Sequence, residues 1–196
     1  MPAFFKLVVP QNTNAICLDG SQASYYTRLS GSSSRWVFYV EDGGAYCVGS
    51  KKTCDEYSDE WPYFTTSAER YHPTTVSADT IFSGDARVSP WATDNFVYMS
   101  YCSLDGWLGE NLGTSFDQYY MRGSTIFKAI INEALATEDI STLEIVLVGS
   151  GSGALGVFNH LSWLVNTVGL TSAQLSIVLD SFHLPVSNIA PAKVTA

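Results

Sequence analysis

Between residues 143 and 165 the chain reads LEIVLVGSGSGALGVFNHLSWLV, so that an apolar run passes through a glycine- and serine-rich turn into a helical pattern. A nearly continuous apolar run is typical of a strand buried on both faces of a parallel sheet. A turn of this kind between a strand and a helix can be a nucleophile elbow, a phosphate-binding loop for a dinucleotide, or a turn without chemistry. The segment therefore predicts a strand–helix unit whose turn is the candidate site.

The rest of the chain continues the alternation of strands and helices. A helical pattern begins near Ser115, where Ser115 and Gln118 form a candidate capping box, and a second one covers about 153–168. This order predicts an α/β fold with a doubly wound, mostly parallel sheet and helices on both faces. Further strand-like runs lie at 5–9, 24–29, 35–42, 95–102 and 175–181.

Length and composition limit the domain organisation and the partners. A chain of 196 residues, 46% hydrophobic and 15% charged, predicts one globular domain over residues 1–196, with a loop-rich excursion at about 48–94. The net charge of −9 disfavours nucleic acid and anionic membranes as partners. No apolar segment approaches the roughly 18 residues of a membrane span, and the first ten residues do not form a signal peptide. We expect a monomer.

The cysteines Cys17, Cys47, Cys54 and Cys102 are even in number. An even count favours two disulfides, with three possible connectivities, and an extracellular location. Four reduced, buried thiols are the alternative. We predict no metal site, because no C-x-x-C spacing occurs and no histidine lies near a cysteine.

The turn fits a dinucleotide fingerprint literally. GSGALG at 151–156 has the G-x-G-x-x-G pattern, follows a strand and opens a helix, while Asp180 ends the next strand as a carboxylate for ribose hydroxyls. Too few residues follow Gly156 to complete a second nucleotide-binding half. Dinucleotide binding is therefore a less favoured alternative, and we predict no cofactor.

An elbow requires small residues two positions before and two positions after the nucleophile. Ser152 meets this requirement and is the candidate nucleophile, whereas Ser150 does not, because Val148 is β-branched. Gly151 has glycines at both positions but has no side chain that could attack an ester. A glycine-rich turn without chemistry therefore remains an alternative.

Four segments together resemble one family. AICLDGSQASYY, RWVFYVEDGGAYC, FVYMSYCS and VLVGSGSGALG match, in order and spacing, the patterns C-x-DGSP-x-x-Y, W-x-x-x-LEGGGWC, V-x-x-x-YC and GSSAGG of the pectin acetylesterase/Notum family. The resemblance extends from about residue 6 to 184. It implies an α/β-hydrolase fold and a secreted carboxylesterase that removes an acyl group from a polysaccharide or a lipidated protein through a serine acyl-enzyme.

The resemblance also implies roles for individual residues. Backbone N–H groups of Gly43, Gly44 and Ala45, with that of the residue after the nucleophile, would form the oxyanion hole. The inserted Asp42 would shift this loop, and Asp180 matches a family aspartate that supports the elbow. The implied disulfides are Cys17–Cys102 and Cys47–Cys54.

The chain departs from the family at the nucleophile. An ungapped alignment with GSSAGG places Gly151 at the nucleophile position, and Ser152 reaches it only after a shift of one residue. The family's catalytic aspartate and histidine lie C-terminal to the matched segments. His183 follows a strand and is the candidate substitute base, whereas His160 lies about two helical turns beyond the elbow and His72 is expected on the surface.

Two hypotheses of different classes follow. In the first, the chain is a secreted serine carboxylesterase that uses Ser152. In the second, it is a catalytically inactive family member that binds a carbohydrate or an acyl group.

Overall fold

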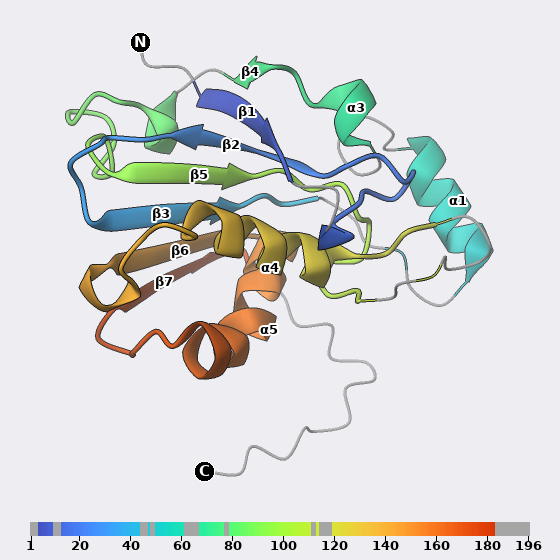
Figure 1. Cartoon of the computed structure of the whole chain (residues 1–196). Helices are drawn as coiled ribbons and strands as arrows, with labels where there is room; N and C mark the ends of the chain where they lie inside the picture. Colours follow the sequence, from blue (N-terminus) through green and yellow to red (C-terminus); the bar gives the residue numbers. More distant parts are fainter. Residues whose placement is uncertain are drawn as a thin grey trace.

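The computed structural model describes residues 4–9, 13–43, 47, 50–60, 67–76, 79–110, 113 and 119–182. Seven strands form one sheet in the order β4-β1-β2-β5-β3-β6-β7 (Figure 1). Strands β5, β3, β6 and β7 run parallel, and β2, β1 and β4 extend the sheet in antiparallel pairing. The predicted α/β fold class with a mostly parallel sheet is confirmed, but the two long helices among the described residues lie on one face of the sheet and not on both. The strands are β1 (Phe4–Val8), β2 (Ser24–Arg28), β3 (Arg35–Val40), β4 (Thr75–Val76), β5 (Asn95–Met99), β6 (Glu144–Ser150) and β7 (Leu175–Asp180).

Two long helices connect the parallel strands. Helix α4 (Gly123–Ala134) joins β5 to β6, and helix α5 (Ser152–Trp163), prolonged by a π turn (Leu164–Val168), joins β6 to β7. Both connections step along the sheet in the same direction, so right-handed crossovers place both helices on the same face. The shorter elements are α1 (Lys51–Glu60), α3 (Ala68–Tyr71) and the 3-10 turns Thr80–Phe82 and Ile140–Thr142.

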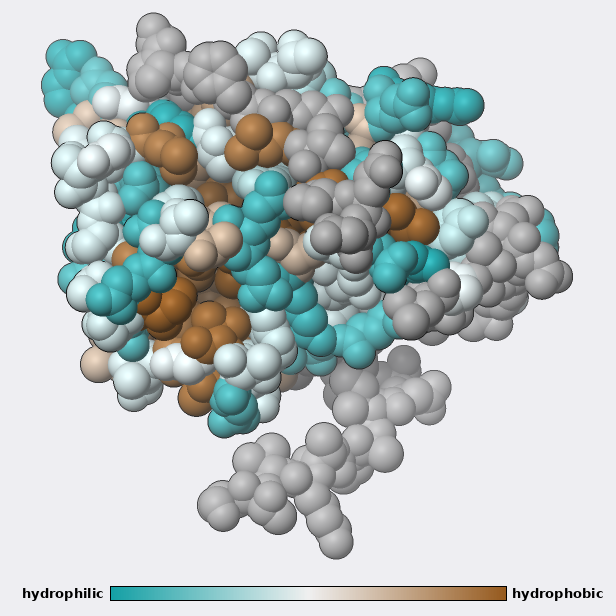
Figure 2. All heavy atoms as spheres, in the orientation of Figure 1, coloured by the Kyte–Doolittle hydropathy of each residue, from teal (hydrophilic) through white to brown (hydrophobic). Residues whose placement is uncertain are grey.

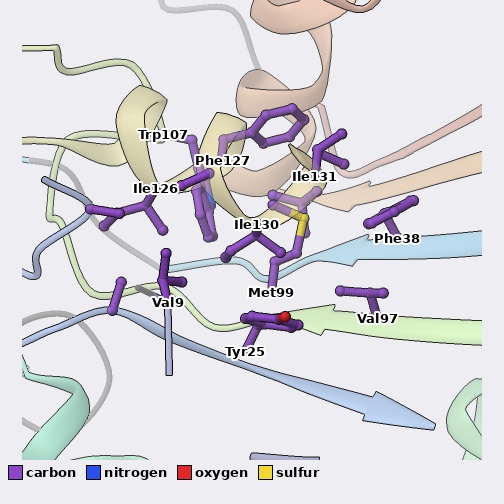
Figure 3. Packing of buried hydrophobic residues seen from close by; sticks show 14 of the residues in the cluster. Val9, Tyr25, Phe38, Val97, Met99, Trp107, Ile126, Phe127, Ile130 and Ile131 are labelled. Atoms are coloured by element: carbon purple, nitrogen blue, oxygen red, sulfur yellow. The ribbon is translucent and has the colours of Figure 1, made fainter. Parts of the chain in front are cut away.

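Successive residues of the apolar strands point to opposite faces of the sheet, so their side chains form two separate packed layers. Phe38, Val97 and Met99 pack under α4, from which Ile130 points toward Met99, whereas Phe127 points toward α5 (Figure 3). On the opposite face, Val37 and Phe96 pack with partly buried aromatic residues, namely Phe82 and Trp91 of the segment before β5 and Tyr98 of β5 itself. Because the chain covers both faces, the strands are apolar on both sides.

Two elements differ from the sequence prediction. Helix α4 begins at Gly123 and not near Ser115, since residues 120–122 are not helical; Ser115 and Gln118 lie outside the described residues. The excursion at 48–94 contains the ten-residue helix α1, which carries ion pairs between Lys51 and Asp55 and between Lys52 and Glu56. Pairs at this spacing stabilise a helix that has few apolar residues.

Within the described part of the chain, no helix is both long enough and apolar enough to cross a bilayer. The face shown in Figure 2 mixes hydrophilic side chains with several separate hydrophobic ones.

Candidate active site

The turn between β6 and α5 has the sharp geometry of an elbow. Gly151 adopts φ +51° and ψ −115°, a conformation that side-chain-bearing residues rarely adopt. Its N–H donates to the backbone oxygen of Asp180 at 3.0 Å, which ties the turn to the end of β7. A Cβ on Gly153 would lie 2.1 Å from the carbonyl oxygen of Val40, so α5 can start this close to β3 only with glycine there. The backbone thus places residue 151 at the apex of the turn.

The space next to the apex holds the side chain of Asp42, from the loop after β3. A Cβ on Gly151 would lie 2.4 Å from both Cγ and Oδ2 of Asp42. Distances below 3.0 Å are essentially never seen for real Cβ atoms. The carboxyl group of Asp42 therefore lies where a side chain at position 151 would begin.

Ser152 lies in the first turn of α5 and is 8% exposed. Its backbone N–H donates to Oδ1 of Asp42 at 3.0 Å, and its hydroxyl donates to the same oxygen at 3.0 Å. The hydroxyl also accepts the N–H of Gly43 at 2.8 Å. The hydroxyl is thus fixed between the Asp42 carboxylate and the Gly43 backbone.

These contacts engage the N–H groups of Gly43 and Ser152, two of the candidate oxyanion-hole donors among the described residues. The N–H of Gly43 points to Ser152 Oγ, and the N–H of Ser152, which follows Gly151, points to the Asp42 carboxylate. A Cβ on Gly43 would lie 1.8 Å from the ring of Tyr101, so this loop can pack on Tyr101 only as glycine. Gly44 and Ala45 lie outside the described residues.

Beneath the loop, Glu41 is held by two donors. The hydroxyl of Tyr98 and the backbone N–H of Tyr101, the latter at 2.8 Å, donate to its carboxylate. Burial raises the pKa of Glu41 to about 7, although both hydrogen bonds act in the opposite direction. The indole N–H of Trp107 donates to the backbone oxygen of Glu41 at 3.0 Å and further fixes the loop that carries Asp42.

A second carboxylate, that of Asp105, connects the loop after β5 to α4. It accepts hydrogen bonds from the Ser103 hydroxyl at 2.6 Å and from the N–H groups of Trp107, Gly109 and Gly123 at 3.0, 3.1 and 2.7 Å. Burial raises the pKa of Asp105 in spite of these donors. The sequence pattern predicts no role in the site for Glu41 or Asp105. A carboxylate at the end of an apolar run was the available signal for Glu41.

His160 is bound on both ring nitrogens. Nδ1 donates to the backbone oxygen of Gly156 at 2.7 Å, Nε2 contacts the hydroxyl of Ser124 at 2.8 Å, and the ring stacks on Phe127 with centroids 4.2 Å apart. Burial lowers the pKa of His160. The residue is 2% exposed and serves the packing of α5 on α4.

His72 does not lie in the described site. Nδ1 of His72 is 2.8 Å from the hydroxyl of Ser24, so this partly buried residue contacts β2. His183 lies outside the described residues. Among the described residues, no group of three or more His, Cys, Asp or Glu side chains could hold a metal ion.

Two disulfides are present, and they have the connectivity that the resemblance implies. Cys17–Cys102 joins the segment before β2 to the loop after β5, and Cys47–Cys54 joins the loop after β3 to α1. The described part of the chain has no free cysteine. The second bridge anchors the chain a few residues after Asp42 and Gly43.

The comparisons with known proteins agree with this architecture. The profile of the family described as Pectinacetylesterase matches residues 3–193. Palmitoleoyl-protein carboxylesterase notum1a of Danio rerio is 31% identical over 180 residues, which are 90% of this chain and 35% of that protein. The inactive palmitoleoyl-protein carboxylesterase notum1b of Danio rerio is 36% identical over 105 residues, which are 53% of this chain and 73% of that protein.

A solved structure of the Wnt deacylase Notum from Drosophila superimposes with a TM-score of 0.76 at 24% identity, covering 90% of this chain and 52% of that one. At this identity the match supports the fold. The chain spans about a third of the length of the curated carboxylesterases that it matches over most of its own residues.

Proposed function

The chain belongs to the Pectinacetylesterase family, and we propose that it is a catalytically inactive member, which binds an acylated ligand without hydrolysing it. The observation that carries the proposal is the position of Asp42, whose carboxyl group lies where the side chain of residue 151 would begin. The ligand would be an acylated polysaccharide or a lipidated protein, the substrate classes that the family resemblance implies. The name of the relative notum1b shows that the family includes inactive members.

Three features of the site oppose ester hydrolysis. Residue 151 has no hydroxyl, and the hydroxyl of Ser152 is engaged by Gly43 and Asp42. The N–H of Ser152, which is the oxyanion-hole donor when residue 151 is the nucleophile position, could be reached by an ester carbonyl only after displacement of the carboxylate of Asp42. Negative charge that develops on that carbonyl oxygen would be repelled by the same carboxylate, whereas a productive site places only donors there.

One contact favours the alternative, a serine carboxylesterase that uses Ser152. The Ser152 hydroxyl donates to Oδ1 of Asp42 at 3.0 Å, and a carboxylate at this distance can accept the proton of a nucleophile. His183 would be the further base in that scheme. Burial of the hydroxyl and its bond to Gly43 oppose it.

The two disulfides favour an oxidising compartment, so we also propose that the protein acts outside the cell. The monomeric state stays a prediction.

A labelling experiment separates the two functions. The full chain is incubated with a fluorophosphonate probe and with p-nitrophenyl acetate, beside Ser152→Ala and Ser150→Ala variants whose folding is checked by circular dichroism. We expect no labelling and no hydrolysis above background in any of the three proteins. Labelling of the wild type that disappears only in Ser152→Ala would overturn the proposal in favour of the esterase.

The binding part is tested by calorimetric titration of the same chain with palmitoleic acid and with acetylated pectin oligosaccharides. We expect saturable binding of at least one of the two ligands. If neither ligand binds, the proposal that the protein binds an acylated ligand is overturned. NAD is titrated in parallel by thermal shift. We expect no shift, because a pyrophosphate at the turn would meet the carboxylate of Asp42.

A further inference from the structure

A cavity of about 700 Å³ opens beside α4, away from the residues of the elbow. Its wall is one face of α4, on which Thr125, Lys128, Ala129, Asn132 and Glu133 recur at helical spacing, together with Thr13 and Glu110 from two loops. This volume lies within the range of sites that hold small molecules. None of its lining residues belongs to the elbow, so the cavity is independent of the acyl chemistry proposed above.

Two of the three charges that line the cavity neutralise each other. The ammonium group of Lys128 forms a hydrogen-bonded ion pair with Oε1 of Glu110. The same oxygen of Glu110 accepts the hydroxyl proton of Ser124 at 2.7 Å. These bonds lower the pKa of Glu110, first through Lys128 and then through Ser124. Glu110 is thus ionised, and its negative charge is balanced by the ammonium group of Lys128.

Glu133, the third charged residue, has no such partner. Within the part of the chain that the structure describes, no cation forms an ion pair with it, and its Oε2 is buried without a hydrogen-bond partner. Its polar neighbour is the hydroxyl of Tyr25. Burial raises the pKa of Glu133, and the bond from Tyr25 opposes that rise. Glu133 as a whole is half-buried, but its Oε2 atom is buried without a partner, so a cationic ligand in the cavity would supply the partner that this oxygen lacks.

We propose that this cavity binds a small organic cation, an alkylammonium group on an apolar body, with Glu133 as the counter-ion. Ala129, Thr13 and Thr125 are among the lining residues and carry methyl groups that can contact the body of the ligand. The pairing of Lys128 with Glu110 removes the positive charge that would repel an ammonium group. The net charge of −9 favours approach of a cation over that of an anion.

The test compares three probes of equal chain length on the full protein, namely hexylammonium, hexanol and hexanoate. Affinities are measured by NMR titration for the wild type, for Glu133→Gln and for Glu138→Gln. Glu138 is an exposed carboxylate outside the cavity, so its variant is a control for the loss of one negative charge.

We expect saturable binding of hexylammonium, at least tenfold weaker binding of hexanol and hexanoate, and backbone shifts centred on residues 125–133. Glu133→Gln should weaken hexylammonium binding at least tenfold, and Glu138→Gln should leave it within twofold of the wild type. The proposal is overturned if hexylammonium does not saturate, if hexanol binds equally well, or if both variants behave alike. If Glu133→Gln does not fold, the ratio of the hexylammonium and hexanol affinities in the wild type decides.

Discussion

The carboxyl carbon of Asp42 lies 2.4 Å from the position that a Cβ on Gly151 would occupy. The two residues come from different loops, after β3 and after β6, and they meet at the apex of the elbow. A side chain at 151 would require this carboxyl group to move away from its hydrogen bonds to Ser152, so the residue types at positions 42 and 151 are coupled.

This exclusion predicts that substitutions at the two positions are coupled. Gly151→Ala should destabilise the fold by about 3 kcal/mol or more, since it adds both backbone strain and a steric overlap. In the Asp42→Ala background the overlap is gone, and we expect the cost of Gly151→Ala to fall by about 1–3 kcal/mol. A double-mutant cycle from urea unfolding measures this difference.

Gly169→Ala is the matched control, because Gly169 has φ +87° and a Cβ added to it would meet no atom within 4 Å beyond its chain neighbours. It should cost about 1–2 kcal/mol in either background. Additivity of Gly151→Ala and Asp42→Ala would contradict the exclusion.

A second prediction concerns the acceptor role of Ser152. Ser152→Ala leaves the N–H of Gly43 without its acceptor in a buried position, and we expect a loss of about 1–3 kcal/mol in the free energy of unfolding. Ser172→Ala removes an exposed hydroxyl and should change it by less than about 0.5 kcal/mol. Equal denaturation midpoints for the two variants would show that the hydroxyl of Ser152 is not structural.

The raised pKa of Glu41 predicts a pH-dependent stability. The carboxylate titrates near 4.5 in the unfolded chain and at about 7 in the folded protein. Between these values the folded state binds more protons, so this group lowers the free energy of unfolding as the pH rises from about 4.5 to 7, by about 3 kcal/mol in total. Above pH 7 its contribution is constant.

Glu41→Gln should remove this slope, because the amide can accept the N–H of Tyr101 and donate to the oxygen of Tyr98. Urea midpoints of both proteins at pH 5, 6, 7 and 8 provide the measurement. Parallel pH profiles for the wild type and the variant would rule out Glu41 as the titrating group.

The two disulfides should contribute unequally to the free energy of unfolding. Cys17–Cys102 closes a loop with a sequence separation of 85, and Cys47–Cys54 one with a separation of 7. From loop-closure entropy, we expect paired serine substitutions to cost about 4–5 kcal/mol for the first bridge and about 2–3 kcal/mol for the second. Thermal unfolding of the two double variants gives the order, and a larger loss for Cys47–Cys54 would contradict it.

The positions of the strands follow from local sequence. Apolar runs such as 144–150 and 95–99 can be buried only as central strands, and the glycines at 149, 151 and 153 permit a turn that other residues would obstruct. The start of α4 did not follow from local sequence. The carboxylate of Asp105 and the carbonyl oxygen of Gly109 accept the first N–H groups of the helix, at Gly123 and Ser124, and these partners lie in a different loop.

The sequence alone determined the family, the fold class and the glycine at the apex of the elbow, because each depends on residue types at fixed spacings along the chain. Only the tertiary structure decided what fills the site. The Asp42 carboxylate and the Ser152 hydroxyl are 110 positions apart in the sequence, and their contact exists because β3 and β6 pair in parallel and end at the same edge of the sheet. The order of residues along the chain does not show that these two side chains are close in space. Here that proximity determines which groups can contact a ligand.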